Sequence, residues 1–226
     1  MTQAREAILS RIRGALADVP VEEPMRWEGP GAAGGADAYR RGPKDGGAGE
    51  ARILEMFLEH VAEYRAAVAR CASGEDVARK VLEACRRHGA QRILLPPEID
   101  QAWLSAELTW VVDTAEDPLA VCDLDAADGV LSAARVGIAE TGTIGLDHGP
   151  DQGRRALTLL PDLHVCVLRR DQIVATVPEG LERLRPAATV GRPVTLVSGP
   201  SATSDIELER VEGVHGPRRL VVLVCD

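Results

Sequence analysis

The sequence predicts an α/β fold, in which a mostly parallel sheet has flanking helices and an N-terminal helical extension. Three apolar runs have the length and composition of buried strands, and segments of helical periodicity separate them. These runs are RILL at 92–95, LHVCVL at 163–168 and LVVLVC at 220–225. The last run is apolar throughout, as is typical of a strand covered on both faces.

The N-terminal part is predicted to stand apart from this fold. Residues 1–18 form a predicted helix with an apolar stripe at three-to-four spacing, made of Ile8, Leu9, Ile12 and Leu16. Eight of the 22 glycines then fall within residues 29–49, so we predict a flexible Pro/Gly-rich linker over 19–49. The α/β domain is predicted to span residues 50–226.

Helices are predicted in three places within this domain. The first covers about residues 50–66. The second begins at Ser73, where Asp76 completes a capping box, and ends at Gly89. A short third helix is predicted over residues 177–184.

Further strands are predicted from shorter apolar runs. WVV at 110–112, LAVC at 119–122 and VTLVS at 194–198 are candidates. Residues 129–147 indicate two short extended runs broken by a tight glycine turn.

Composition excludes several kinds of protein. The 226 residues carry a net charge of −9, which argues against binding to nucleic-acid phosphates. No apolar run approaches the roughly 20 residues that span a bilayer, and the N-terminus has no apolar signal-peptide core. We therefore expect a cytoplasmic protein with no membrane span. Only Lys44 and Lys80 are lysines, and neither is placed for Schiff-base or P-loop chemistry.

The five cysteines are too far apart to form a CxxC pair. An iron–sulfur cluster or structural zinc held by this chain alone is therefore not expected. Most of the cysteines lie in apolar segments and are predicted to be reduced thiols of the core.

The densest group of polar residues and glycines lies at 139–147. Glu140 stands beside a glycine turn between two apolar runs, so it is a candidate nucleophile or acid–base catalyst. Thr141, Gly142 and Thr143 are candidate ligand-binding neighbours. The alternative is a turn glutamate that binds nearby amides.

A second group follows the predicted strand at 194–198. A glycine turn and hydroxyl side chains that open a short helix are typical of an anion site. The candidate ligand-binding residues are Gly199, Ser201, Thr203 and Asp205. Ordinary helix capping is the alternative.

Histidine and arginine supply the remaining candidates. His215 lies between glycines before the last strand and is a candidate proton carrier, with a surface loop as the alternative. Arg154 is a candidate carboxylate ligand. His164 is predicted to be a core histidine, while Asp147 and His148 are too few to indicate a metal site.

Taken in order, AETGTIGL, RRALTLLPDLHVCVL, QIVATVPEGLERL and SGPSATSDIELERVEGVHGP resemble the lactate utilization protein C (LutC/YkgG) family, whose members carry a LUD domain. The resemblance runs over about 90 residues. It implies a fold of the NagB/RpiA/CoA-transferase type. It also implies a role in bacterial oxidation of L-lactate to pyruvate beside two partner subunits that hold iron–sulfur clusters, with no cofactor in this chain.

Three functions follow from these expectations. The first is an accessory subunit that binds a small carboxylate or a partner at the end of the sheet. The second is a CoA or acyl transferase, because AETGTIGL also resembles the glutamate turn of family I CoA-transferases, on which Glu140 would be the nucleophile. The third is a regulatory binding module without catalysis. In the first, Glu140, Ser201, Thr203 and His215 line one site.

Overall fold

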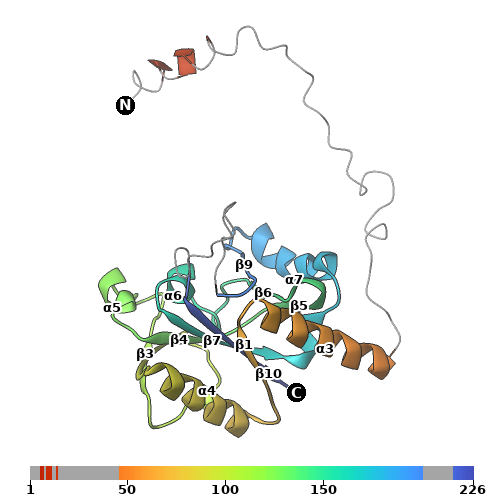
Figure 1. Ribbon diagram of the computed structural model, residues 1–226. Helices are drawn as coiled ribbons and strands as arrows, with labels where there is room; N and C mark the ends of the chain where they lie inside the picture. Colours follow the sequence, from red (N-terminus) through yellow and green to blue (C-terminus); the bar gives the residue numbers. More distant parts are fainter. Residues whose placement is uncertain (1–5, 8, 12–13, 15–45, 201–215) are drawn as a thin grey trace. The chain divides into compact units, whose positions relative to one another are not determined.

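A six-stranded sheet forms the centre of the fold (Figure 1). The computed structural model describes residues 6–7, 9–11, 14, 46–200 and 216–226. The strands of the sheet lie in the order β1 (Ala67–Cys71), β10 (Arg219–Cys225), β7 (Leu163–Arg169), β4 (Gly129–Ala133), β2 (Arg92–Leu95) and β3 (Thr109–Val112). All neighbouring strands are parallel, which confirms the predicted α/β class.

Helix α4 (Gly74–His88) covers one face of this sheet. It begins as predicted, because the Ser73 hydroxyl accepts a hydrogen bond from the Asp76 amide at 3.2 Å. It ends at Gly89, whose φ of 68° is the left-handed conformation that glycine adopts at little cost. The inner stripe of α4 is buried against β7 and β10 and consists of Val77, Val81 and Cys85.

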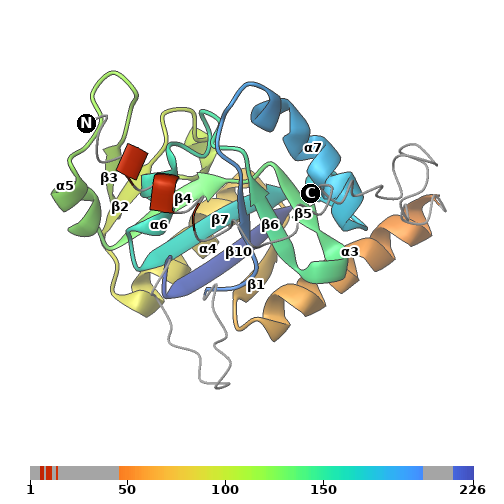
Figure 2. The ribbon, with the colours of Figure 1, turned by 90° about the horizontal axis from the view of Figure 1, so that it is seen from above.

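A second, four-stranded sheet packs over the opposite face (Figure 2). Its strands lie in the order β8 (Ile173–Val174), β5 (Val136–Ile138), β6 (Thr143–Leu146) and β9 (Thr195–Val197). Helix α3 (Gly46–Glu63) and the central sheet bury one side of it through Phe57, Ile144 and Leu168. Helix α7 (Val177–Thr189) packs on the other side, where Leu184 meets Val136 and Ile138.

Short elements close the remaining part of that face. Helices α5 (Val121–Asp125) and α6 (Arg155–Leu159) bury Leu124 and Leu157 against β2 and β4. The 3-10 turns are η2 (Gln101–Trp103), η3 (Ala139–Thr141) and η4 (Arg170–Gln172). The strand predicted at 119–122 is wrong, since α5 starts inside it; a four-residue apolar run has too little periodicity to separate the two.

The elements differ from the sequence prediction in further places. Helix α7 runs to Thr189 rather than ending near residue 184, and α6 and β8 have no counterpart in the prediction. Helix α3 begins at Gly46 rather than near residue 50, so it includes the last residues of the predicted linker. Residues 129–146 form three strands instead of two extended runs. Strand β1 was not predicted, because AVARC is half exposed at a sheet edge and carries no clear pattern.

Part of the N-terminal prediction lies outside the described residues. Residues 6–7, 9–11 and 14 are helical, within the helix predicted over 1–18, and residues 19–45 of the predicted linker are not described. In the described part of the chain, no helix combines the length and the apolar character needed to cross a membrane.

Candidate functional site

Arginine side chains gather where the central parallel strands end. Strands β4, β7 and β10 are neighbours, and the residues at or just after their carboxyl ends include Arg135, Arg169, Arg170 and Asp226. Open α/β sheets bind ligands at this edge. The carboxyl ends of these strands are therefore the first place to look for a ligand site.

A hollow of about 720 Å³ opens at this edge. Ile53, Leu54 and Ile173 supply apolar surface, and the charged lining consists of Glu50, Arg169, Arg170, Asp171, Arg183 and Asp226. Its charges are largely paired with one another: Arg169 lies 3.2 Å from Asp171, and Arg170 lies 3.7 Å from Asp226. The hollow is therefore polar at its rim and close to neutral.

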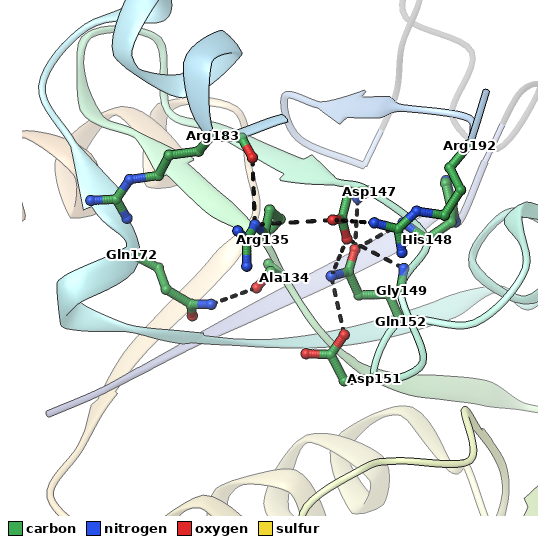
Figure 3. Close-up of polar contacts among 10 residues, drawn as sticks. All are labelled: Ala134, Arg135, Asp147, His148, Gly149, Asp151, Gln152, Gln172, Arg183 and Arg192. Carbon is green, nitrogen blue, oxygen red and sulfur yellow. Dashed lines mark hydrogen bonds and ion pairs between the residues drawn. The ribbon is translucent and has the colours of Figure 1, made fainter. Parts of the chain in front are cut away.

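Beside it, two arginines converge on one buried carboxylate (Figure 3). Arg135 follows β4, Asp147 follows β6, and Arg192 lies between α7 and β9. Asp147 Oδ2 is 3.3 Å from Arg192 Nη2 and 4.0 Å from Arg135 Nε. We call Arg135, Asp147, Gln152 and Arg192 the Asp147 cluster.

Gln152 fixes the carboxylate of this cluster. Its amide nitrogen donates to Asp147 Oδ1 at 2.9 Å, and its amide oxygen accepts from the Asp147 backbone N–H at 2.8 Å. The Gly149 N–H also donates to Oδ1 at 3.3 Å. Because Oδ1 is occupied, the carboxylate turns only Oδ2 toward the two arginines.

His148 adjoins the cluster in an unusual backbone conformation. Its φ of 51° is uncommon for a residue other than glycine. Nδ1 lies 3.0 Å from the Gly153 carbonyl and Nε2 lies 2.8 Å from the Thr195 hydroxyl. A carbonyl can only accept, so Nδ1 carries the proton and Nε2 accepts from Thr195. Burial, with Arg155 and Arg192 nearby, lowers the pKa of His148, which favours the neutral ring.

The predicted residues Thr141, Gly142 and Thr143 come together with Ser198. The Thr143 hydroxyl lies 2.8 Å from that of Thr141 and 2.7 Å from that of Ser198. Gly142 has a φ of 56°, and a Cβ there would lie 2.6 Å from the backbone carbon of His60 in α3. The turn is therefore closed tightly against α3.

Glu140 is exposed and holds the start of α7. Its Oε1 accepts from the Val177 N–H at 2.6 Å, and its own N–H donates to the Ala175 carbonyl at 3.0 Å. A carboxylate at a helix N-terminus is stabilised there by the helix dipole. This contact favours the turn interpretation of Glu140, while its catalytic role stays a prediction.

Arg154 is engaged away from this turn. Nε and Nη2 bind both carboxylate oxygens of the buried Asp113 at 2.8 and 2.9 Å, and Nη2 also donates to the Leu119 carbonyl. This pairing raises the pKa of the guanidinium. No described contact joins Arg154 to Thr141, Gly142 or Thr143.

The remaining predicted residues lie in or beside a part of the chain that is not described. Gly199 is buried with a φ of 81°, and a Cβ there would meet Tyr64 at 2.6 Å. Ser201, Thr203, Asp205 and His215 lie outside the described residues. Their convergence with Glu140 on one ligand therefore stays a prediction.

His164 is a core histidine, as predicted. It is 1% exposed, its Nε2 lies 2.8 Å from the Ser132 hydroxyl, and its Nδ1 has no hydrogen-bond partner among the described residues. Burial lowers its pKa to about 4, so the ring is neutral at pH 7. Four cysteines are buried as expected, and only Cys122 is exposed.

Sequence reasoning did not find the Asp147 cluster. The sequence pattern of Asp147 and His148 points only to metal ligation, and in the described residues no three His, Cys, Asp or Glu side chains gather in a metal-binding arrangement. Arg135 and Arg192 lie 57 positions apart and belong to no common motif. The available signal was the compact DHGPDQG loop, with its glycines and proline between charged residues.

Comparison with known proteins gives consistent matches. A profile of the LUD domain matches residues 54–225. A protein of Deinococcus radiodurans named Lactate utilization protein C is 49% identical over 174 residues, which cover 77% of this chain and 80% of that protein. A protein of the same name from an Exiguobacterium species is 29% identical over 98% of this chain and 96% of its own length.

A solved structure agrees with the fold. The crystal structure of a DUF162 family protein from Deinococcus radiodurans matches with a TM-score of 0.68 and 42% sequence identity. The match covers 78% of this chain and 98% of that one. The overlap supports the arrangement of strands and helices described above.

Proposed function

Because this chain belongs to the LUD domain family, we propose that it serves lactate utilization as an accessory subunit of a bacterial system that oxidises L-lactate to pyruvate. The observation that carries the proposal is the 49% identity to a protein named Lactate utilization protein C across most of both chains. The electrons leave the substrate through iron–sulfur clusters held by partner subunits.

The arginine-rich edge of the sheet supports this role. Lactate and pyruvate are small monoanions, and Arg135 and Arg192 face one buried carboxylate near the end of β4, whereas Arg169 and Arg170 are paired with Asp171 and Asp226. Guanidinium groups bind carboxylates with charge-assisted hydrogen bonds. The chain would therefore hold the substrate or product anion while the partners accept electrons.

A growth experiment tests the proposed role. The gene is deleted in its host, and growth is compared on L-lactate and on pyruvate as sole carbon source. We expect the deletion strain to fail on L-lactate only, and a plasmid copy of the full chain to restore growth. Extracts of the restored strain should reduce a dye when L-lactate is added. Normal growth of the deletion strain on L-lactate would overturn the role.

The purified chain provides a second readout. By itself it should not reduce the dye with L-lactate, because the oxidation needs the partner subunits. Adding the partners should restore dye reduction. Turnover by the chain alone would contradict the accessory role and favour an independent enzyme.

A further inference from the structure

Two buried aspartates, Asp113 and Asp147, contact arginines in different ways. Arg154 and Asp113 form a closed pair, with two nitrogens on two oxygens at 2.8 and 2.9 Å. These distances are typical of charge-assisted hydrogen bonds. The Asp147 cluster is open by comparison, because its arginine contacts are 3.3 and 4.0 Å long and share one oxygen.

The Asp147 carboxylate cannot rotate to offer both of its oxygens to the arginines, as Asp113 does to Arg154. Gln152 Nε2 and the Gly149 N–H already occupy Asp147 Oδ1, and the carboxylate is buried. One oxygen therefore faces two guanidinium groups. Asp147 Oδ2 thus holds both guanidinium groups close to it, but one oxygen cannot accept hydrogen bonds from all of their N–H groups.

Several donors of these arginines remain available. Within the described residues, neither terminal nitrogen of Arg135 has a hydrogen-bond partner, and Arg192 bonds only through Nη2. Arg155 adds a third positive charge near His148, while Asp151 adds a second carboxylate beside Gln152. The local balance is positive in a chain whose overall charge is negative.

We propose that Arg135 and Arg192 bind the carboxylate of a small organic monoacid, with Asp147 and Gln152 as the residues that position them. The ligand carboxylate would accept hydrogen bonds from N–H groups of Arg135 and Arg192 that are not directed at Asp147 and that have no partner among the described residues. The choice of acid rests on the proposed function, whereas the site itself rests on the cluster geometry. Arg135 and Arg192 are both exposed, so a ligand reaches them from solvent.

Titration calorimetry on the purified full chain tests this site. The probes are L-lactate, pyruvate, the uncharged analogue lactamide, and inorganic phosphate. We expect both acids to bind, lactamide not to bind, and phosphate to bind more weakly than the acids. Tighter binding of phosphate, or no binding of either acid, would overturn the proposal.

Substitutions locate the site. Arg135→Gln and Arg192→Gln should each weaken binding of both acids about tenfold or more, since each removes charge-assisted bonds. The matched control is Arg185→Gln, which removes an exposed arginine of α7 that pairs with Glu182 and should bind as the wild type does. If Arg135→Gln and Arg192→Gln bind the acids as tightly as the control Arg185→Gln does, the acids do not bind at this site.

A conservative variant separates recognition from folding. Arg192→Lys keeps the charge but not the planar fork, so its affinity should lie between that of the wild type and that of Arg192→Gln. The variants should fold as the wild type does by circular dichroism, and the melting temperatures of Arg135→Gln and Arg192→Gln should fall by no more than a few degrees, because each loses one contact with Asp147. If the wild-type chain binds neither acid but the deletion strain still needs it for growth on L-lactate, only this site is refuted. If the chain binds the acids but the deletion strain grows normally on L-lactate, only the proposed function is refuted.

Discussion

Residues 139–146 and 147–153 follow one another in the chain but are held by opposite kinds of interaction. In the first segment, Gly142 packs closely against the backbone of α3, and Ile144 and Leu146 are buried in the core. In the second, Asp147, His148 and Gln152 are held by hydrogen bonds and ion pairs. The segment with the densest local motif is fixed by close packing, whereas the charged contacts of the next segment come from distant parts of the sequence.

This difference explains why local sequence is a poor guide to the charged site. A glycine turn can be predicted from sequence because its residues are neighbours in the chain. The Asp147 cluster depends on the second sheet, which brings the segment after β6 beside those after β4 and α7. The comparison predicts large steric effects in the first segment and moderate, charge-dependent effects in the second.

The largest expected effect is that of Gly142→Ala. The new Cβ would lie 2.6 Å from the backbone carbon of His60, at a φ of 56° that strains any residue with a side chain. We expect the free energy of unfolding to fall by about 3 kcal/mol, from overpacking and backbone strain together. Urea unfolding followed by circular dichroism measures it.

Gly89→Ala is the matched control. Gly89 has a similar φ of 68°, but a Cβ there meets nothing within 4 Å. Its loss should be about 1 kcal/mol, the cost of the backbone conformation without a clash. Equal losses in the two variants would mean that close packing does not fix the turn.

A moderate effect is expected from Asp147→Asn. The amide keeps the shape but removes the charge that faces Arg135 and Arg192, which should lower the free energy of unfolding by about 2 kcal/mol. The control is Asp162→Asn, which breaks an exposed ion pair with Arg218 and should cost less than about 0.5 kcal/mol. Both are measured by urea unfolding at low salt. If the two losses are the same, the cluster contributes no more than a surface ion pair.

A smaller effect is expected from His148→Asn, because asparagine tolerates a positive φ. At pH 7 the loss of the bonds to Gly153 and Thr195 should cost about 1 kcal/mol. The pKa of His148 is lowered in the folded state, so below about pH 6.5 the unfolded chain binds more protons and wild-type stability falls. This part of the acid sensitivity should disappear in the variant.

Urea unfolding at pH 7 and at pH 5 measures the difference between the two proteins. His164, whose pKa burial lowers to about 4, contributes a larger loss between about pH 6.5 and 4, and it does so in both proteins. The variant should therefore lose less stability on acidification than the wild type. Parallel curves would show that His148 does not titrate differently on folding.

The parts of the fold that sequence predicted were those encoded by neighbouring residues. The capping box of Ser73 and Asp76 and the buried runs at 163–168 and 220–225 need only local spacing, and the structure confirms them. The second sheet could not be predicted, because β6 pairs with β9 about 50 residues away. For the same reason sequence does not reveal that Arg135 and Arg192 contact Asp147.

The smallest expected effect on stability is that of Glu140→Gln. The amide oxygen can still accept from the Val177 N–H, so only the interaction of the charge with the N-terminus of α7 is lost, which is worth about 0.5 kcal/mol at an exposed position. The melting temperature should therefore stay close to that of the wild type.

Because the fold is preserved, growth on L-lactate becomes a direct test of the catalytic role predicted for Glu140 from sequence. Failure to grow with an unchanged melting temperature would support chemistry at this carboxylate, as the hypothesis requires. Growth at the wild-type rate would reject that hypothesis and leave Glu140 as a residue that binds the first amide of α7, beside the capping box of Thr176 and Glu179. It would also strengthen the contrast between a first segment fixed by packing and a second fixed by charge.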